Sequence, residues 1–218
     1  MKRQGQAGFS LLEMMISMVI MLALMGIVTS LLSRNLGVRA RESQRTDALT
    51  SAEAALNVMS REIANSGFGI YTGTNARLAN NGIITADSNS TQIHFRANVY
   101  NAGVMNTTSS VLTTDDAGED ITYFFDASTN SIVRFDPNDT PQTSVVVNKI
   151  SSVTYTYFDY SGTSSTGTQT TTPTANTGRI RITVLVQLDP IQGQPNPSDV
   201  QFTSEVTLRN SPYMLNQY

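Results

Sequence analysis

The sequence predicts an α+β protein, in which one long N-terminal helix packs on a head built mainly of antiparallel β-strands. Three observations lead to this class. An almost unbroken apolar run covers residues 11–32, apolar residues then recur at helical spacing as far as residue 63, and the hydrophobic pattern alternates as in strands after Gly67. A chain of 218 residues is long enough for one good-sized domain plus an appendage.

Composition argues against several kinds of function. Only 14% of the residues are charged and the net charge is -3, whereas a nucleic-acid-binding protein usually presents a basic face. The chain has no cysteine and a single histidine, His94, which excludes disulfides, the usual zinc sites and Cys/His catalysis. The sequence contains no phosphate-binding glycine loop and no G-x-S-x-G motif. We therefore expect no enzyme activity, no required cofactor and no nucleic-acid partner.

The apolar run predicts a membrane span. Between residues 11 and 32, 17 of 22 residues are apolar, and roughly 20 helical residues cross the hydrocarbon core of a bilayer. A secretory signal has a shorter apolar region of about 7–15 residues with a small-residue cleavage site, so we expect this span to be retained. Counting basic flanks alone would place the far side in the cytoplasm, because two basic residues precede the run and four follow it: Lys2, Arg3, Arg34, Arg39, Arg41 and Arg45.

One acid, Glu13, interrupts the start of the run. A carboxylate costs about 2.5–3.5 kcal/mol at the bilayer centre but less near the end of a span, so a harmless interfacial acid is one interpretation. Its neighbours favour another, because this segment resembles the N-terminal signature of type IV prepilins. That signature is a short basic leader ending in Gly, then Phe-[ST]-Leu-x-Glu and a long apolar helix, and the matching residues are Gly8, Phe9, Ser10, Leu11, Leu12 and Glu13.

The resemblance implies how the N-terminus is processed. Residues 1–8 would be a leader that a prepilin peptidase removes after Gly8 on the cytoplasmic side, and the same enzyme would N-methylate the new amino terminus at Phe9. Residues 9–32 would then be the transmembrane helix and later the filament core, with the head pointing away from the cytoplasm. This orientation, implied by the family, opposes the one given by the basic flanks.

The chemistry of the motif gives Glu13 a role in assembly. Cleavage creates an amine at Phe9 that is cationic near neutral pH, and Glu13 follows four residues later, one helical turn away. The carboxylate can compensate this amine, or the amine of a neighbouring subunit, where water is scarce. Because burial of such a pair costs desolvation, we expect it to set register and docking more than stability.

Residues 33–66 are expected to continue the helix in amphipathic form, with Gly67 as its C-cap. The apolar stripe packs on the chain's own sheet in our interpretation, and consists of Leu49, Ala52, Leu56, Met59 and Ile63. Its first four arginines, Arg34, Arg39, Arg41 and Arg45, are interpreted as a solvated face partly paired with Glu42 and Asp47, with lipid head groups or acidic neighbours as the alternative.

Residues 67–218 form the predicted periplasmic or extracellular β head. Ile93, Phe95, Ala97 and Val99 alternate along one strand, and "DASTNS" is the turn of a predicted hairpin. The run "VVVNKISSVTYTYFDY" supplies one or two strands, and two more lie within 178–189 and 199–210. The Ser/Thr-rich stretch 161–177 is expected to be a mobile loop. Short connections favour a mainly antiparallel sheet laid against the helix.

Four further segments resemble the PilW-type minor pilins in the same order: residues 59–69, 150–159, 179–190 and 204–210. The resemblance implies a non-catalytic minor pilin of a type IV pilus, acting in initiation or in a tip complex. Implied partners are other minor pilins, the major pilin, the prepilin peptidase/N-methyltransferase, the inner-membrane assembly platform and, through residues 9–32, membrane lipid. The J-type pseudopilins of type II secretion have a similar plan. A membrane-anchored adhesin or exoenzyme that uses the helix only as an anchor is the alternative from another class.

Remaining chemistry is sparse. Two acidic clusters could hold Ca²⁺ through hard oxygen ligands, although acidic residues are also ordinary in turns: Asp115, Asp116, Glu119 and Asp120 in the first, and Asp136, Asn138 and Asp139 in the second. The tyrosines could form an aromatic binding surface, but they lack nearby basic clusters and tyrosine is common in strands. These are Tyr71, Tyr100, Tyr155, Tyr157 and Tyr160.

Overall fold

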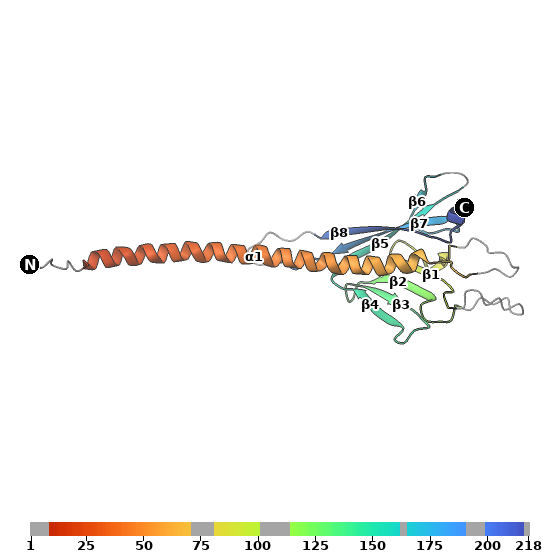
Figure 1. Ribbon diagram of the computed structural model, residues 1–218, viewed down its shortest axis with the longest axis horizontal. Helices are drawn as coiled ribbons and strands as arrows, with labels where there is room; N and C mark the ends of the chain where they lie inside the picture. The colour runs from red at the N-terminus through yellow and green to blue at the C-terminus, as the bar shows by residue number, and fades with distance from the viewer. Residues whose placement is uncertain (1–8, 71–80, 101–113, 162–164, 191–198, 216–218) are drawn as a thin grey trace, which may run out of the picture. The chain divides into compact units, whose positions relative to one another are not determined.

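The computed structural model describes residues 9–70, 81–100, 114–161, 165–190 and 199–215. The chain divides into two compact units, residues 1–45 with 189–197, and residues 46–188 with 198–218. The helix α1, Leu11–Ala64, contributes residues to both units. The remaining helices are short: a 3₁₀ turn, η1, at Thr85–Asp87, and α2 at Pro212–Leu215 (Figure 1).

Helix α1 runs without a break through the predicted span and the predicted amphipathic segment. Its first turn is closed by the amide of Met14, which donates to the Ser10 carbonyl at 3.1 Å. The helix ends at Ala64, two residues earlier than predicted, and the chain then turns through Gly67. Gly67 has φ of +77° and its amide donates to the Arg96 carbonyl at 2.8 Å, so this glycine closes the helix against the first strand.

The first sheet has four antiparallel strands in the order β1-β2-β3-β4, with the bounds Gln92–Arg96, Asp120–Asp126, Ser131–Phe135 and Thr143–Val147. The predicted hairpin is confirmed as β2–β3, and Asp126 ties its turn by accepting from the amide and the hydroxyl of Ser128. The predicted alternation was wrong at one end. Strand β1 stops at Arg96, and Val99 is 48% exposed because its amide turns away to the Glu119 carboxylate.

The second sheet, also antiparallel, has the order β6-β5-β7-β8, with the bounds Thr168–Thr170, Ile150–Asp159, Thr177–Val186 and Val200–Thr207. The single predicted sheet is therefore two. The run from residue 145 to 160 supplies strands to both, because Lys149 adopts a left-handed φ of +58° that redirects the chain between β4 and β5. The stretch expected to be only a loop contains β6, whose residues pair with Tyr157, Phe158 and Asp159.

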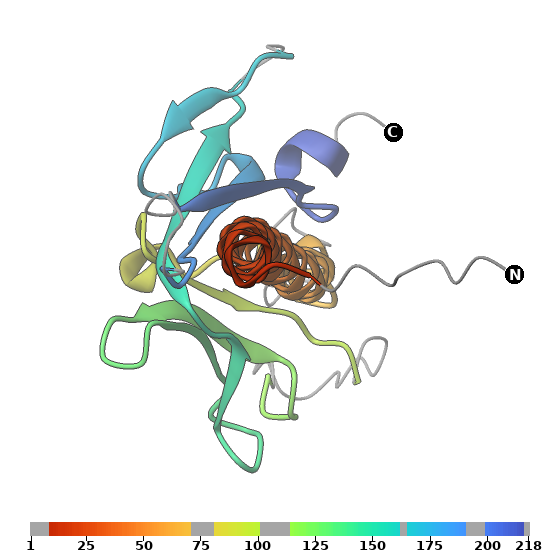
Figure 2. The same ribbon diagram turned by 90° about the vertical axis from the view of Figure 1, so that its left-hand side faces the viewer.

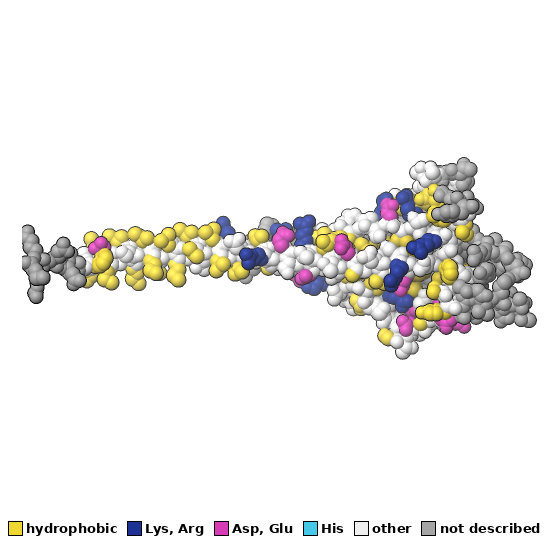
Figure 3. Space-filling model, viewed as in Figure 1, with side chains coloured by type: hydrophobic (Ala, Val, Ile, Leu, Met, Phe, Trp, Pro, Cys, Tyr) yellow, Lys and Arg dark blue, Asp and Glu magenta, His cyan; other side chains and the backbone are white. Residues whose placement is uncertain are grey.

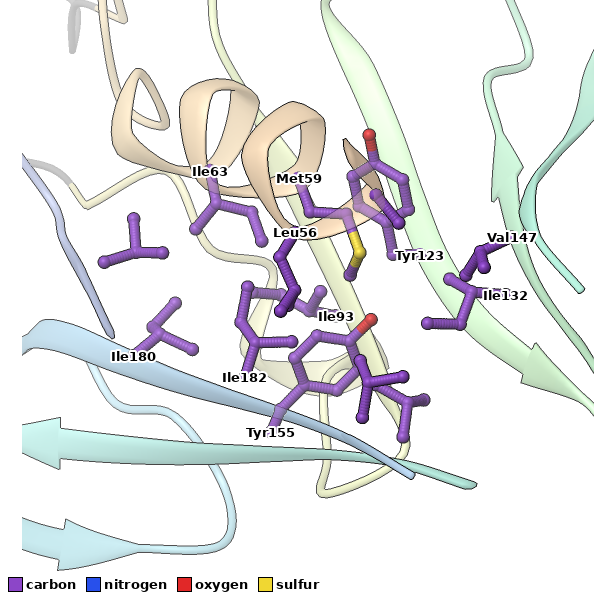
Figure 4. Close-up of a cluster of buried hydrophobic side chains, with 14 of the residues drawn as sticks. Leu56, Met59, Ile63, Ile93, Tyr123, Ile132, Val147, Tyr155, Ile180 and Ile182 are labelled. Carbon is purple, nitrogen blue, oxygen red and sulfur yellow. The ribbon is translucent and has the colours of Figure 1, made fainter. Parts of the chain in front are cut away.

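The hydrophobic core of the second unit joins the helix to both sheets. Ala52, Leu56, Met59 and Ile63 of α1 are buried as predicted, whereas Leu49 at the start of the stripe is 40% exposed. Figure 4 shows Leu56 and Met59 projecting from the helix toward aromatic and aliphatic side chains from both sheets, among them Tyr123 and Tyr155. Both sheets border this part of the helix in the view of Figure 2. The helix stripe thus fills a core that neither sheet could close alone.

Candidate functional site

The predicted site at the N-terminus lies where the apolar helix begins. Gly8 falls outside the described residues. Phe9 is 80% exposed and precedes the helix, and Glu13 lies in the first helical turn. The hydroxyl of Ser17 donates to the backbone carbonyl of Glu13 at 2.8 Å and not to its carboxylate. Within the described part of the chain the Glu13 carboxylate has no hydrogen-bond or ion-pair partner, so it is available to a group from another molecule or to a new amine at Phe9.

Local helix physics offers a second reason for an acid at this position. Negative charge is favoured in the first turn, where unpaired amides give the helix end a partial positive charge. Ser10 and Glu13 also have the spacing of a capping box. No side-chain hydrogen bond between them is present in this region of the structure. The carboxylate therefore has a mild local preference for its place without being committed to a cap.

A cationic amine at Phe9 would lie near the same positive helix end, where a positive charge is disfavoured. A carboxylate one turn further on offsets that penalty. The arrangement can therefore hold an ammonium group that the helix alone would disfavour, either on the same chain or on a neighbouring one. The arrangement is chemically suited to recognition of a positive charge.

The helix surface beyond Glu13 is apolar on every side. From Leu11 to Val38 each large hydrophobic side chain in the described structure is at least 50% exposed. Figure 3 shows these side chains along the N-terminal part of α1, with basic side chains following them. A helix that is hydrophobic all round needs a membrane or a bundle of other helices around it. The helix is long and apolar enough to cross a membrane.

The first acidic cluster does not gather into one ligand set. Asp115 and Asp116 are exposed, whereas Glu119 is fully buried and accepts hydrogen bonds from the amides of Val99 and Tyr100 at 2.7 and 2.9 Å. Asp120 instead faces β1, where His94 Nε2 lies 2.5 Å and Arg96 Nε 2.9 Å from its two oxygens. Its role in the structure is to hold two basic side chains.

The second cluster also ties loops together. Asp136, with a fully buried side chain, accepts from the Gly118 amide at 2.6 Å and pairs with Arg134 at 3.2 Å. Asn138 donates to the Thr114 carbonyl at 2.8 Å. Asp139 lies 3.7 Å from Arg134. Among the described residues no group of three or more His, Asp or Glu side chains is arranged to hold a metal ion.

A polar link between the helix and the first sheet was not anticipated. Tyr123 donates to Glu62 at 2.5 Å, and Arg134 Nε lies 3.3 Å from the same Glu62 oxygen. Burial and the Glu62 charge raise the pKa of the Tyr123 hydroxyl, so it stays a donor. Burial works to lower the pKa of Arg134, but the charge and hydrogen bond of Glu62, together with the charges of Tyr123 and Asp136, outweigh burial and raise the pKa. Helical spacing could have found Glu62, since it flanks Ile63 at the edge of the buried stripe.

The tyrosines do not form an aromatic surface. Tyr155 and Tyr157 are fully buried, and burial raises the pKa of both hydroxyls. Tyr160 stacks on Tyr213 with ring centroids 3.9 Å apart, so its face is occupied from within the chain. Tyr71 falls outside the described residues. Tyr100 alone is strongly exposed among those described, at 73%.

The N-terminal segment is similar to a known protein family. Residues 3–29 match the family model of the prokaryotic N-terminal methylation motif, which covers the end of the basic leader, Glu13 and most of the apolar run. A search of curated proteins and a search of solved structures found no match. The structure itself is an α+β architecture of the pilin-like kind, with a long N-terminal apolar helix and antiparallel sheets. The motif and this architecture together indicate a type IV pilin-like or pseudopilin-like protein.

Proposed function

We propose that this chain is a minor pilin of a type IV pilus, of the PilW type, acting in initiation of the filament or in its tip complex. One observation carries the proposal. The methylation motif runs directly into the part of α1 from residue 11 to 32, which is apolar on all sides. Its one acid, Glu13, has no partner within the described residues. Such a helix is an assembly element, because its surface is satisfied only by lipid or by other helices.

In the proposed mechanism, a prepilin peptidase hydrolyses the Gly8–Phe9 peptide bond on the cytoplasmic side. Residues 1–8 leave with a carboxylate at Gly8, and Phe9 gains an amine that is then methylated. Residues 9–32 hold the chain in the inner membrane with the head in the periplasm. During assembly the helix passes from lipid into the filament core, and Glu13 pairs with the Phe9 amine of a neighbouring pilin. The assembly platform, the major pilin and other minor pilins are the partners.

The energetics favour a role in docking over one in stability. Burying an ion pair costs about as much in desolvation as the charges return, whereas removing one partner leaves the other charge buried and costs about 3–5 kcal/mol. A subunit in the wrong register would bury Glu13 and a neighbour's amine separately. The pair therefore acts against misplaced subunits more than it strengthens correct ones.

The first experiment is mass spectrometry of the N-terminus of the protein isolated from native membranes. The expected N-terminal residue is Phe9 carrying an added methyl group. An intact Gly8–Phe9 bond, or a chain that begins at Met1, would overturn the proposal and favour a membrane-anchored adhesin or exoenzyme. Processed protein found with a secretion complex, and not in sheared surface filaments, would instead assign it to the J-type pseudopilins.

The second experiment separates charge recognition from helix capping at Glu13. Glu13→Ala removes both, whereas Glu13→Gln retains a side chain that can cap a helix but carries no charge. We expect both variants to lower incorporation into sheared filaments by on the order of 100-fold, the equivalent of about 3 kcal/mol. Glu53→Ala is the matched control, because Glu53 is an exposed acid on the same helix. Incorporation of Glu13→Gln at the wild-type level would show that capping, and not charge, is what matters.

A further inference from the structure

Four arginines follow the apolar run on α1: Arg34, Arg39, Arg41 and Arg45. Arg34, Arg39 and Arg45 are exposed and Arg41 is half-buried. Within the described residues none of the four forms an ion pair. Four of the described arginines in the head differ, because Arg96, Arg134, Arg179 and Arg181 each contact at least one carboxylate. This basic band is therefore a set of cations without anions in the part of the chain described.

The acids within the same segment do not neutralise the band. Only two, Glu42 and Asp47, accompany the four arginines. The sequence predicts partial pairing with them, but none of the four arginines has an ion pair among the residues that the structure describes. The segment carries an excess of positive charge that needs an anionic partner or water.

The position of the band along the helix suggests which anion it meets. Arg34 follows Glu13 by 21 residues, a rise of ~32 Å along an α-helix. The hydrocarbon core of a bilayer is ~30 Å thick and the polar layer on each side adds ~5–8 Å. Glu13 and Arg34 would therefore lie at opposite edges of the hydrocarbon. Arg39 and Arg41 lie ~8 and ~10 Å further along the axis, and Arg45 ~16 Å further.

Side-chain direction brings two of these arginines back toward the bilayer. The Cα–Cβ bonds of a helix tilt toward its N-terminus, which here is the side of the apolar run. Arg39 and Arg41 therefore lean toward the polar layer of the membrane, and the long side chain of Arg34 can reach it by snorkelling outward. Arg45 is too far along the axis for the same contact.

We propose that Arg34, Arg39 and Arg41 bind the phosphate groups of anionic phospholipids at the membrane face from which the helix emerges. The guanidinium group suits this ligand because its planar fork donates two hydrogen bonds to phosphate oxygens. Charge complementarity and the match between helix rise and bilayer thickness identify lipid as the occupant. The proposal rests on the membrane span in the proposed function, but it does not depend on any role in a filament.

The test uses the full chain reconstituted in phosphatidylcholine vesicles that contain spin-labelled phosphatidylglycerol or spin-labelled phosphatidylcholine. Electron paramagnetic resonance measures how strongly each labelled lipid is immobilised at the protein surface. We expect wild type to prefer phosphatidylglycerol by at least about fivefold, since one basic residue near the surface contributes about that factor. Arg34→Gln/Arg39→Gln/Arg41→Gln should bring the preference to near one. Raising the salt to about 1 M shortens the Debye length to ~3 Å and should reduce the preference of wild type for phosphatidylglycerol.

Matched variants keep the proposal falsifiable. Arg45→Gln and Arg61→Gln each remove one exposed positive charge from the same helix and should leave the preference unchanged. A triple variant that retains the wild-type preference overturns the proposal, as does an equal loss in Arg45→Gln. If millimolar inorganic phosphate at constant ionic strength abolishes the preference for phosphatidylglycerol, the ligand of these arginines is free phosphate and the lipid proposal is overturned. Wild type without lipid preference, together with a triple variant excluded from filaments, would assign the band to an acidic partner helix.

Failure of the membrane span is distinguishable from failure of the lipid site. A chain extracted from the vesicles by alkaline carbonate does not span the bilayer, and that result rejects the anchor itself. A chain that resists extraction but shows no lipid preference retains the anchor and rejects only the arginine site.

Discussion

The two ends of helix α1 differ in how their apolar side chains are covered. At the C-terminal end, Met59 and Ile63 are fully buried among strands of both sheets. At the N-terminal end, side chains of the same chemistry are exposed, for example Met18 at 66% and Ile20 at 54%. The apolar side chains at the C-terminal end are covered by the protein's own strands. The N-terminal end has its apolar surface left for lipid or for other helices to cover.

Charges divide in the same way. In the head, Arg134 contacts Glu62 on α1 and also Asp136 and Asp139 in the turn that follows β3. Along the N-terminal part of the helix, Glu13 and the basic band have no ion-pair partner in the described structure. A region whose apolar and charged groups are both unsatisfied by its own chain is one built for surroundings that the isolated chain lacks. The described part of the head is the opposite, because it buries an apolar core and pairs several of its arginines with carboxylates of its own chain.

The largest expected effect tests this division with two methionines. Met59→Ala should lower the free energy of unfolding of the head by about 2–5 kcal/mol, because it leaves a cavity in a filled core. Met18→Ala removes the same atoms from the exposed part of the same helix and should change that free energy by less than ~0.5 kcal/mol. Urea unfolding of the full chain in detergent, followed through tyrosine signals of the head, measures both. Similar losses in the two variants would break the comparison.

A second test compares a paired with an unpaired arginine. Arg134→Gln leaves the fully buried Asp136 without its guanidinium partner and weakens the link to Glu62. We expect a loss of about 2–3 kcal/mol, because hydrogen bonds to charged groups and buried unpaired charges are expensive. Arg39→Gln makes the same change in charge where no ion pair is present and should leave the unfolding free energy of the head within ~0.5 kcal/mol. Equal effects would show that the network around Arg134 carries no stability.

Predictions from the sequence were confirmed where an element buries one face and its hydrophobic residues repeat with a single helical or strand period. The buried stripe of α1 and the alternation in β7 follow directly from hydrophobic spacing, since each faces one continuous core. Prediction from the sequence failed at the division into two sheets, which falls between β4 and β5, where Lys149 has a left-handed φ of +58° that the hydrophobic pattern does not encode. Propensity also missed β6, which is held by pairing with β5 and not by its own apolar residues.

The N-terminal motif could be recognised from the sequence for a different reason. Its information lies in fixed spacing within one short segment, from the leader glycine to Glu13, and a motif needs no tertiary contact to be recognised. The Glu62–Tyr123–Arg134 link could not be found in this way. Glu62 is 61 positions from Tyr123 and 72 from Arg134 in the chain, and nothing local in any of the three residues indicates the others.

A third, smaller effect separates two tyrosines of the head. Tyr123 donates to Glu62, whereas the buried hydroxyl of Tyr155 has no hydrogen-bond partner among the residues that the structure describes. Tyr155→Phe should raise the unfolding free energy by about 1 kcal/mol, since a buried unsatisfied hydroxyl costs energy. Tyr123→Phe should lower it by about 1–2 kcal/mol, because Glu62 loses its donor. Urea unfolding of both variants at neutral pH measures the difference, and changes of the same sign would contradict it.

The smallest expected effect concerns a surface pair and tests whether charge pairing as such stabilises the head. Glu205 accepts from Arg181 at 2.6 and 2.9 Å and lies 3.0 Å from Arg179, but its side chain is 38% exposed. The hydrogen bond from Arg181, aided by the charges of both arginines, lowers the pKa of Glu205 below its ordinary value of 4.5. A lowered pKa means that the carboxylate stabilises the folded state above that value and loses this contribution as the pH falls below it.

Glu205→Gln should therefore cost less than about 1 kcal/mol at pH 7, because solvent screens an exposed pair. The difference from wild type should shrink as the pH falls well below 4.5, since both proteins then carry a neutral side chain at this position. Urea unfolding at pH 7 and at the lower pH measures this, with Glu53→Gln as the control for removal of an exposed acid. If Glu205→Gln lowers the unfolding free energy equally at low pH, Glu205 stabilises the head through packing over the β-sheet. Ion pairing at the surface of the head would then contribute nothing to its stability.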